Sequence, residues 1–159
     1  MMNRDGREPT PEAQLRSYID RLDPKNQKLI RSVRAAVRRR FPTANELAYD
    51  YTRFVVIGYS PTDRGIDSIL ALAARPTGVS LYFSQGPRLP DPKGLLLGSA
   101  KQTRFIHIET PRRLAHPDVA ALIAATIDQA RIPFPPEGKG SLIIKSASAK
   151  KRPRRRRTK

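Results

Sequence analysis

The feature that most constrains the fold is the shortness of the connections between successive strand-like runs. In these runs β-branched and aromatic residues alternate with small or polar ones, and turn residues bracket them, which is typical of strands. The predicted strands cover residues 47–51, 54–59, 66–74, 78–84 and 103–109. Parallel neighbours need a crossover of about a dozen residues, and most of these connections are shorter. The chain is therefore expected to form an antiparallel sheet of about five strands.

Helix signals lie on both sides of this run of strands. Thr10-Pro11 and Asp23-Pro24 each place a capping side chain directly before a proline, a pattern that marks the first turn of a helix. The second of these helices ends at Phe41-Pro42, because the residue before a proline avoids the α conformation. Pro117 opens a third helix after the last predicted strand. The sequence therefore predicts an α+β fold in which two N-terminal helices and one C-terminal helix pack on the antiparallel sheet.

Two segments leave more than one interpretation open. Residues 85–102 form a long connection with three glycines and three prolines, and such a loop is either functional or holds a short helical turn. Residues 140–145 are a short apolar run that either pairs at an edge of the sheet or docks without pairing. The folded domain is expected to span residues 10–144, after a flexible N-terminus over residues 1–9.

The composition excludes several kinds of chemistry. Among 159 residues there are only two His and no Cys, which rules out disulfides, thiol catalysis and cysteine zinc sites. No nucleophile motif or phosphate-binding loop is present, so no catalytic residue, metal ligand or cofactor is predicted. The chain also has no apolar run of the ~20 residues that span a bilayer, and no secretory signal. A non-enzymatic protein of the cytoplasm is therefore expected.

The net charge of +17 is concentrated at the C-terminus. Residues 145–159 contain nine basic side chains and no acidic one, so this tail is expected to be disordered. Such a tail suits sequence-independent contact with nucleic acid or another polyanion. The candidate contacts in the tail are Lys150, Lys151, Arg152, Arg154, Arg155, Arg156 and Arg157. The alternatives are an anionic membrane surface, or no specific partner at all.

A second basic surface is predicted on the helix that begins at Pro24. At 100° per residue its apolar side chains share one arc, and most of its cations share the opposite arc. The candidate polyanion contacts on this helix are Lys28, Arg31, Arg34 and Arg38. The aromatic platform of a single-strand reader is not evident, because the few aromatic residues are interpreted as core. No oligomeric state is predicted.

A third group of cations lies at predicted strand ends and turns. Arg64, Lys101 and Arg104 would form a site for a small anion if the sheet brought them together. The alternative is that these side chains are solvated, or paired with Asp50 and Asp67. The small-anion site is therefore a hypothesis that depends on the fold.

Six short motifs along the chain are similar to those of a known family. They are Ala36-Val-Arg-Arg-Arg-Phe-Pro42, Leu47-Ala-Tyr-Asp-Tyr51, Val56-Ile-Gly-Tyr-Ser-Pro61, Gln85-Gly86, Leu89-Pro-Asp-Pro92 and Gly98-Ser-Ala-Lys-Gln102. Together they resemble the YdhG-like domain family of small bacterial proteins, over most of residues 12–152. The resemblance implies a frataxin-like arrangement of helices on an antiparallel sheet. It also implies an alternative function, because at least one relative is described as a frataxin-like iron chaperone.

The sequence departs from the frataxin pattern where iron would bind. Iron binding of that type uses an acidic ridge on a helix and the adjoining strand edge. Here the first helix offers only Glu12 and Asp20, and the second helix is strongly basic. A domain with positive net charge repels Fe²⁺. The resemblance therefore carries over the fold, with iron as an alternative and no metal ligand assigned.

Overall fold

The predicted helix starts are confirmed by the computed structural model, which describes residues 8–146. Thr10 Oγ1 accepts a hydrogen bond from the Ala13 amide (3.1 Å), and Asp23 accepts one from the Asn26 amide (2.9 Å). The described part of the chain has the α-helices α1 (Pro11–Ile19), α2 (Pro24–Arg40) and α3 (Pro117–Asp128). Its 3₁₀ helices are η1 (Gly65–Asp67), η2 (Gly86–Arg88) and η3 (Pro111–Ala115).

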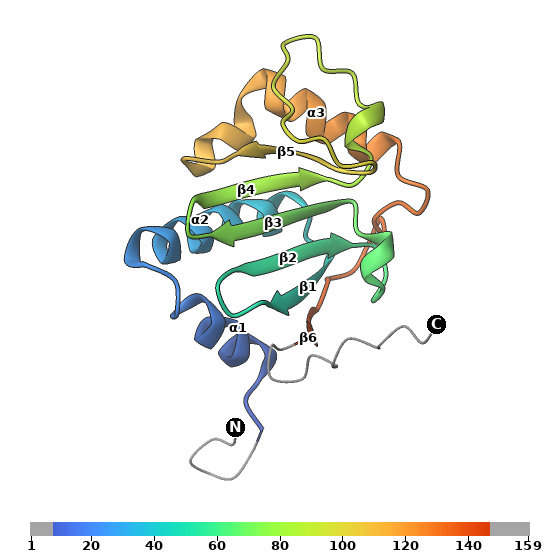
Figure 1. Cartoon of the computed structure of the whole chain (residues 1–159). Coiled ribbons are helices and arrows are strands. Elements are labelled where there is room, and N and C mark those ends of the chain that lie inside the picture. Colours follow the sequence, from blue (N-terminus) through green and yellow to red (C-terminus); the bar gives the residue numbers. More distant parts are fainter. Residues whose placement is uncertain (1–7, 147–159) are drawn as a thin grey trace, which may run out of the picture.

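Six strands in the described residues form one sheet (Figure 1). They are β1 (Asn45–Asp50), β2 (Val55–Ser60), β3 (Leu70–Arg75), β4 (Gly78–Phe83), β5 (Arg104–His107) and β6 (Leu142–Ser146). Their order across the sheet is β5-β4-β3-β2-β1-β6. The neighbours from β1 to β5 are antiparallel, as the short connections predict. The expected α+β class, with helices packed on a mostly antiparallel sheet, is therefore confirmed.

The sixth strand corrects the prediction of about five antiparallel strands. β6 pairs in parallel with β1, with Leu142 opposite Glu46 and Ile144 opposite Ala48. The intervening chain is long enough for a parallel pair, and it returns the apolar run to the sheet edge. Gly140 permits this return, because a Cβ there would lie 1.8 Å from the Ala44 carbonyl oxygen. The run for which pairing and docking were both open is therefore an edge strand. It extends through Lys145 to Ser146, so the predicted boundary of the disordered tail at residue 145 is wrong by two residues, because these residues continue the pairing with β1.

The predicted strand over residues 66–74 begins later than expected. Its first residues belong to η1, where the Ser68 amide donates to the Gly65 carbonyl (3.0 Å). The Thr62 hydroxyl donates to the Asp67 carboxylate (2.8 Å) and holds the turn closed. β3 then starts at Leu70. These local hydrogen bonds stabilise a turn at residues that the apolar pattern assigned to a strand. The apolar pattern alone does not distinguish a turn from a strand.

The two faces of the sheet have different surroundings. Side chains alternate between the faces, and Ile57, Leu72 and Leu81 lie in register on the face that α2 covers. In Figure 1 α2 passes behind the strands, and α3 lies beyond β5. Buried residues of α2 and α3 join one hydrophobic cluster with this face. The opposite face is turned toward the viewer, and none of the described α-helices crosses in front of it.

Within residues 8–146, every helix is too short or too polar to cross a bilayer.

Candidate functional site

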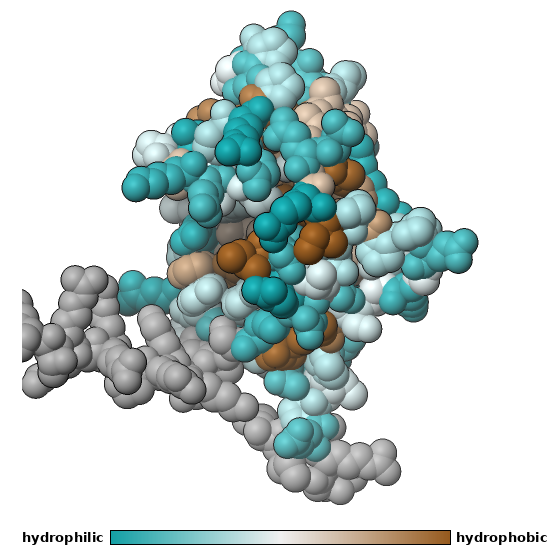
Figure 2. All heavy atoms as spheres, turned by 90° about the vertical axis from the view of Figure 1, so that its right-hand side faces the viewer, coloured by the Kyte–Doolittle hydropathy of each residue, from teal (hydrophilic) through white to brown (hydrophobic). Residues whose placement is uncertain are grey.

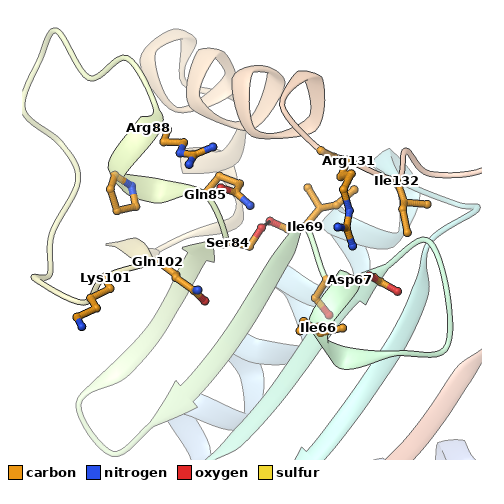
Figure 3. A pocket seen from close by; sticks show the side chains of 13 residues that line it. Ile66, Asp67, Ile69, Ser84, Gln85, Arg88, Lys101, Gln102, Arg131 and Ile132 are labelled. Atoms are coloured by element: carbon orange, nitrogen blue, oxygen red, sulfur yellow. Dashed lines mark hydrogen bonds between the residues drawn. The ribbon is translucent and has the colours of Figure 1, made fainter.

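A pocket of about 520 Å³ opens at one end of the sheet, and we call it the end pocket. Its walls come from η1, the residues after β4, η2, the residues before β5 and the segment after α3 (Figure 3). Figure 2 views this side of the molecule, where apolar side chains gather among hydrophilic ones. The volume falls within the ~300–1,000 Å³ range of small-molecule sites.

The local sequence fixes the walls of the end pocket. Gly86 lets η2 approach the start of β5, because a Cβ there would lie 2.3 Å from the Arg104 amide nitrogen. The Ser84 hydroxyl donates to the Ile69 carbonyl (3.0 Å), which ties the end of β4 to the start of β3. The Gln129 side-chain amide donates to the Arg88 carbonyl (3.3 Å) and links the end of α3 to η2. These three contacts thereby hold η2, β5, the adjoining ends of β3 and β4 and the end of α3 around one opening.

Three exposed cations line the end pocket: Arg88, Lys101 and Arg131. Figure 3 shows Gln85 between Arg88 and Arg131, and Lys101 at the opposite rim, directed away from the opening. Within residues 8–146 none of the three cationic groups makes a side-chain hydrogen bond or ion pair. The acidic lining residue is Asp67, whose carboxylate already accepts from Thr62. The wall therefore has an excess of positive charge that suits an anion.

The same pocket also exposes apolar surface. Ile66 is 81% exposed and Ile132 is 38% exposed, and both line the opening. Large exposed isoleucines beside unpaired arginines form an amphipathic site, because one part favours an anion and the other an apolar group. The arrangement can hold a small organic anion. Of its lining hydroxyls, that of Ser84 is already bonded to a backbone carbonyl.

The predicted small-anion residues are only partly brought together. Lys101 lines the end pocket, but Arg64 and Arg104 do not. The Arg104 guanidinium donates to the carbonyls of Ala100 and Thr103, so it stabilises its own loop. Arg64 lies exposed in the turn before η1.

The sequence reasoning missed Arg88 and Arg131, the two arginines of the end pocket. Arg88 lies in a 3₁₀ turn, and Arg131 follows a helix much later in the chain. No sequence pattern relates two positions so far apart, so the sequence alone could not predict that they share a pocket. The one available signal was the glycine- and proline-rich connection over residues 85–102, whose length is typical of a functional loop or of one that holds a helical turn.

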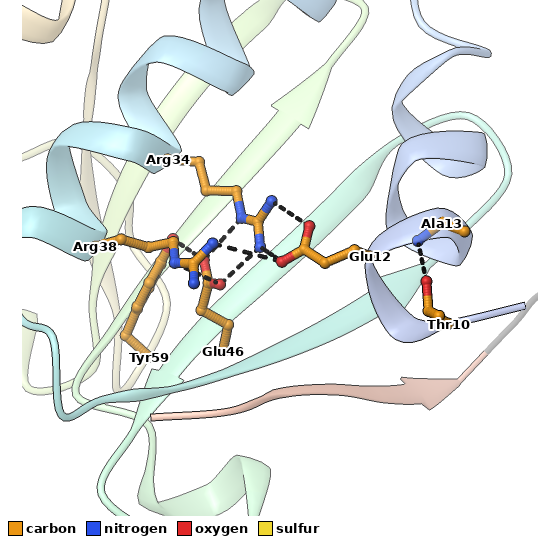
Figure 4. Close-up of polar contacts among 7 residues, drawn as sticks. All are labelled: Thr10, Glu12, Ala13, Arg34, Arg38, Glu46 and Tyr59. Carbon is orange, nitrogen blue, oxygen red and sulfur yellow. Dashed lines mark hydrogen bonds and ion pairs between the residues drawn. The ribbon is translucent and has the colours of Figure 1, made fainter. Parts of the chain in front are cut away.

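The predicted basic face of α2 is largely engaged in ion pairs (Figure 4). Arg34 is 13% exposed and donates to Glu46 (2.8 Å) and Glu12 (2.9 Å). Arg38 lies 3.4 Å from both of these carboxylates, and Arg31 pairs with Asp20 at 2.5 Å. These carboxylates come from α1, the turn after it and β1, so the pattern of α2 alone could not reveal them.

The ion pairs leave less of the α2 face for a polyanion than its sequence implies. Among the four predicted contacts, Lys28 is an exposed residue, whereas Arg34 is committed to carboxylates inside the fold. The tail contacts from Lys150 to Arg157 lie outside the described residues. Contact with a polyanion through either surface therefore stays a prediction.

Tyr59 joins the group of paired side chains between α2 and the sheet, and we call this group the cluster. Its hydroxyl donates to Glu46 (2.9 Å) in the buried interior. Burial raises the pKa of the Tyr59 hydroxyl well above 10, and the adjacent Glu46 carboxylate raises it further. The Arg34 hydrogen bond lowers the pKa of the Glu12 carboxyl below 4.5. The cluster therefore keeps its charges paired, and its chemistry is that of a structural clamp between α1, α2 and β1.

Fold and site together define a small α+β domain with an amphipathic, cation-lined pocket at one end of its sheet. Comparison of the chain with protein-family models, curated proteins and solved structures finds no match. The resemblance to YdhG-like and frataxin-like proteins therefore stays a prediction. Across residues 8–146, no three His, Cys, Asp or Glu side chains are grouped so that they could hold a metal ion.

Proposed function

We propose that the domain is a binding module for small organic anions, which it takes up in the end pocket. The ligand class is a carboxylate or phosphate attached to a compact apolar group. Arginine suits both anions, because its planar guanidinium offers paired donors that match two oxygens. The apolar group would cover Ile66 and Ile132, whose exposure to water is unfavourable.

One observation carries this proposal: Arg88 and Arg131 share the end pocket, and within the described residues neither guanidinium has a carboxylate partner. Elsewhere in the fold Arg21, Arg31 and Arg34 are each paired with an acid. The two pocket arginines therefore keep donors for an incoming anion, and they do so inside a cavity.

The proposal is tested by isothermal titration calorimetry with hexanoate, phenyl phosphate and the neutral hexanamide. We expect binding of the two anions and none of the amide. Arg88→Gln and Arg131→Gln should each weaken anion binding by about tenfold or more, since a hydrogen bond to a charged group contributes ~1.5–3 kcal/mol. Arg39→Gln is the matched control, because Arg39 is an exposed arginine of α2 away from the pocket.

Two results would contradict the end pocket as the site. Equal affinity for hexanoate and hexanamide would show that the cations play no part. Anion binding that Arg39→Gln weakens as much as Arg131→Gln would show that only the overall charge matters. Titration of Fe²⁺ in the same instrument tests the alternative of a frataxin-like iron chaperone, which rests on the family resemblance alone.

A second proposal concerns the tail, and it rests on the nine basic residues within 145–159. We propose that this segment makes sequence-independent contact with nucleic acid or another polyanion. Phosphate neutralisation by such a segment makes binding steeply salt-dependent. Replacement of its arginines by glutamine is therefore expected to flatten the dependence of duplex affinity on salt.

A further inference from the structure

The face of the sheet opposite α2 carries an unusual set of side chains, and we call it the open face. Alternation along the strands places Tyr49, Val56, Ala71, Tyr82, Phe105 and His107 on it. In Figure 1 this face is turned toward the viewer. A solvated face of an antiparallel sheet is commonly polar, whereas this one is rich in aromatic and small apolar residues. It therefore has the composition of a surface that meets a partner.

Two groups of stacked rings lie on the open face. On β4 and β5 the rings of Tyr82 and Phe105 are stacked with centroids 4.9 Å apart and an interplanar angle of 27°. At the hairpin between β1 and β2 the rings of Tyr51 and Phe54 are stacked at 4.8 Å and 15°. The Arg75 guanidinium lies 4.2 Å from the centroid of the Phe54 ring. Each group presents flat π surface with a fixed orientation.

Small side chains separate the two groups. In the strand register the row between them has Val56 opposite Ala73, and Ala73 opposite Ser80. Tyr51 is 43% exposed, His107 is exposed, and Tyr82 and Phe105 are half-buried. The side chains between the two groups are therefore no larger than valine, so a planar ligand can extend from one group of rings to the other. Leu97, 41% exposed, flanks Phe105 on its other side. The sequence-based interpretation of these aromatic residues as core is wrong for this set.

The charge of the open face selects an anionic partner. The acidic residues of the six strands are Glu46 and Asp50, and both lie in register with the face that α2 covers. Arg34 and Arg21 hold them there. The strand positions of the open face thus contain no carboxylate, and they do contain the cation Arg75. Stacked rings, small residues and positive charge together fit flat bases joined by phosphates.

We propose that the open face binds single-stranded nucleic acid, with bases stacked on the Tyr82–Phe105 pair and on the Tyr51–Phe54 pair. The backbone phosphates are attracted by Arg75 and by the positive charge of the domain. This surface is distinct from the end pocket, so it does not depend on the proposed function. It is also distinct from the basic tail. The open face would select single strands over duplex through its aromatic rings, whereas the tail would attract both through charge.

The test measures fluorescence anisotropy of a labelled thymidine 12-mer and of a 12-base-pair duplex with the full chain at about 200 mM salt. Tyr82→Val removes one ring and keeps a residue that favours strands. We expect it to weaken single-strand binding at least about fivefold, since stacking of one base contributes ~1–3 kcal/mol. Tyr82→Phe keeps the ring and should bind as the unaltered chain does. Neither change alters charge, so the salt slope and the duplex affinity should stay the same.

Tyr51→Thr provides a second variant at an exposed hairpin position, in case the loss of Tyr82 unfolds the sheet. The proposal is overturned if the unaltered chain binds duplex and single strand equally, or if neither Tyr82→Val nor Tyr51→Thr weakens single-strand binding. It is also overturned if sedimentation shows a dimer that Tyr82→Val dissociates. The open face would then be covered by a second copy of the chain.

Discussion

At the scale of single residues, the fold depends on carboxylates and cations that come from different elements. Glu46 is buried on β1, where Arg34 from α2 balances its charge and the Tyr59 hydroxyl donates a hydrogen bond to it. A buried carboxylate without a cation is strongly destabilising, because desolvation of the charge is then not compensated. Arg34 is therefore better understood as an internal counter-ion than as a surface contact for phosphate.

This role predicts a large effect of Arg34→Met on stability. Methionine retains much of the aliphatic stem but removes both short hydrogen bonds from Arg34 to buried Glu46, and leaves Arg38 at 3.4 Å as its remaining cation. We expect the free energy of unfolding in urea to fall by ~3 kcal/mol, in the range found when one partner of a buried ion pair is removed. Arg39→Met, an exposed change on the same helix, should alter it by no more than ~0.5 kcal/mol. Similar small losses for both variants would contradict the counter-ion role.

The Glu12 carboxyl predicts a specific dependence of stability on pH. The hydrogen bond from Arg34 lowers the pKa of Glu12 below its ordinary value of 4.5. A carboxyl whose pKa is lower in the folded state stabilises the fold above pH 4.5, and this contribution is lost as the pH falls through the folded pKa. Glu12→Gln should therefore destabilise the protein at pH 7 more than at pH 3. Urea unfolding at both pH values measures this, and an equal loss at both would contradict it.

At the scale of elements, the edge strand β6 depends on one close backbone approach. The Gly140 amide donates to the Pro42 carbonyl (2.9 Å), and the Glu46 amide donates to the Ser141 carbonyl (2.9 Å). A methyl group on Gly140 would collide with the carbonyl of Ala44 rather than with a movable side chain. The pairing of β6 with β1 is therefore sensitive to a very small change.

Gly140→Ala is expected to displace the chain that leads into β6. The free energy of unfolding should fall by ~1–3 kcal/mol, the usual effect of forcing extra atoms into a packed site. Hydrogen exchange of the β6 amides should accelerate, while that of β3 and β4 should change much less. Lys139→Ala is the control in the same segment, because Lys139 is exposed. Unaltered exchange in β6 of the Gly140→Ala variant would show that the approach is not needed.

The same elements show what the sequence could and could not predict. Caps and apolar periodicity are local signals, so Thr10 and Asp23 correctly predicted the starts of α1 and α2. The partner of β6 is a non-local property, since no local pattern records that residues 142–146 return to β1. The end pocket is non-local in the same way, because Arg88 and Arg131 belong to segments joined only by the fold. Of the three residues predicted for a small-anion site, Lys101 lines the end pocket, whereas Arg64 and Arg104 do not, and anion binding by Lys101 stays a prediction.

At the scale of the whole molecule, the excess of positive charge is divided between the domain and the tail. Residues 145–159 hold nine of the 31 basic residues, of which Lys145 belongs to β6, and none of the 14 acidic ones. Inside the domain, ion pairs with Asp20, Glu12 and Glu46 neutralise part of the α2 face. Sequence-independent attraction to a polyanion is therefore expected to come mainly from the tail. The aromatic rings of the open face would add selectivity for single strands.

This division predicts which charges set the salt dependence of duplex binding. Changing Arg154, Arg155, Arg156 and Arg157 to Gln in the full chain should reduce the slope of log affinity against log salt by ~3–4, at ~0.9 for each phosphate that is no longer neutralised. The matched control removes the same charge from the domain by changing Lys25, Lys28, Arg39 and Lys139 to Gln. Anisotropy with a labelled duplex between about 50 and 300 mM salt measures both slopes. We expect the control to retain most of the original slope; a larger reduction in the control would move the polyanion site from the tail to α2 and its neighbours.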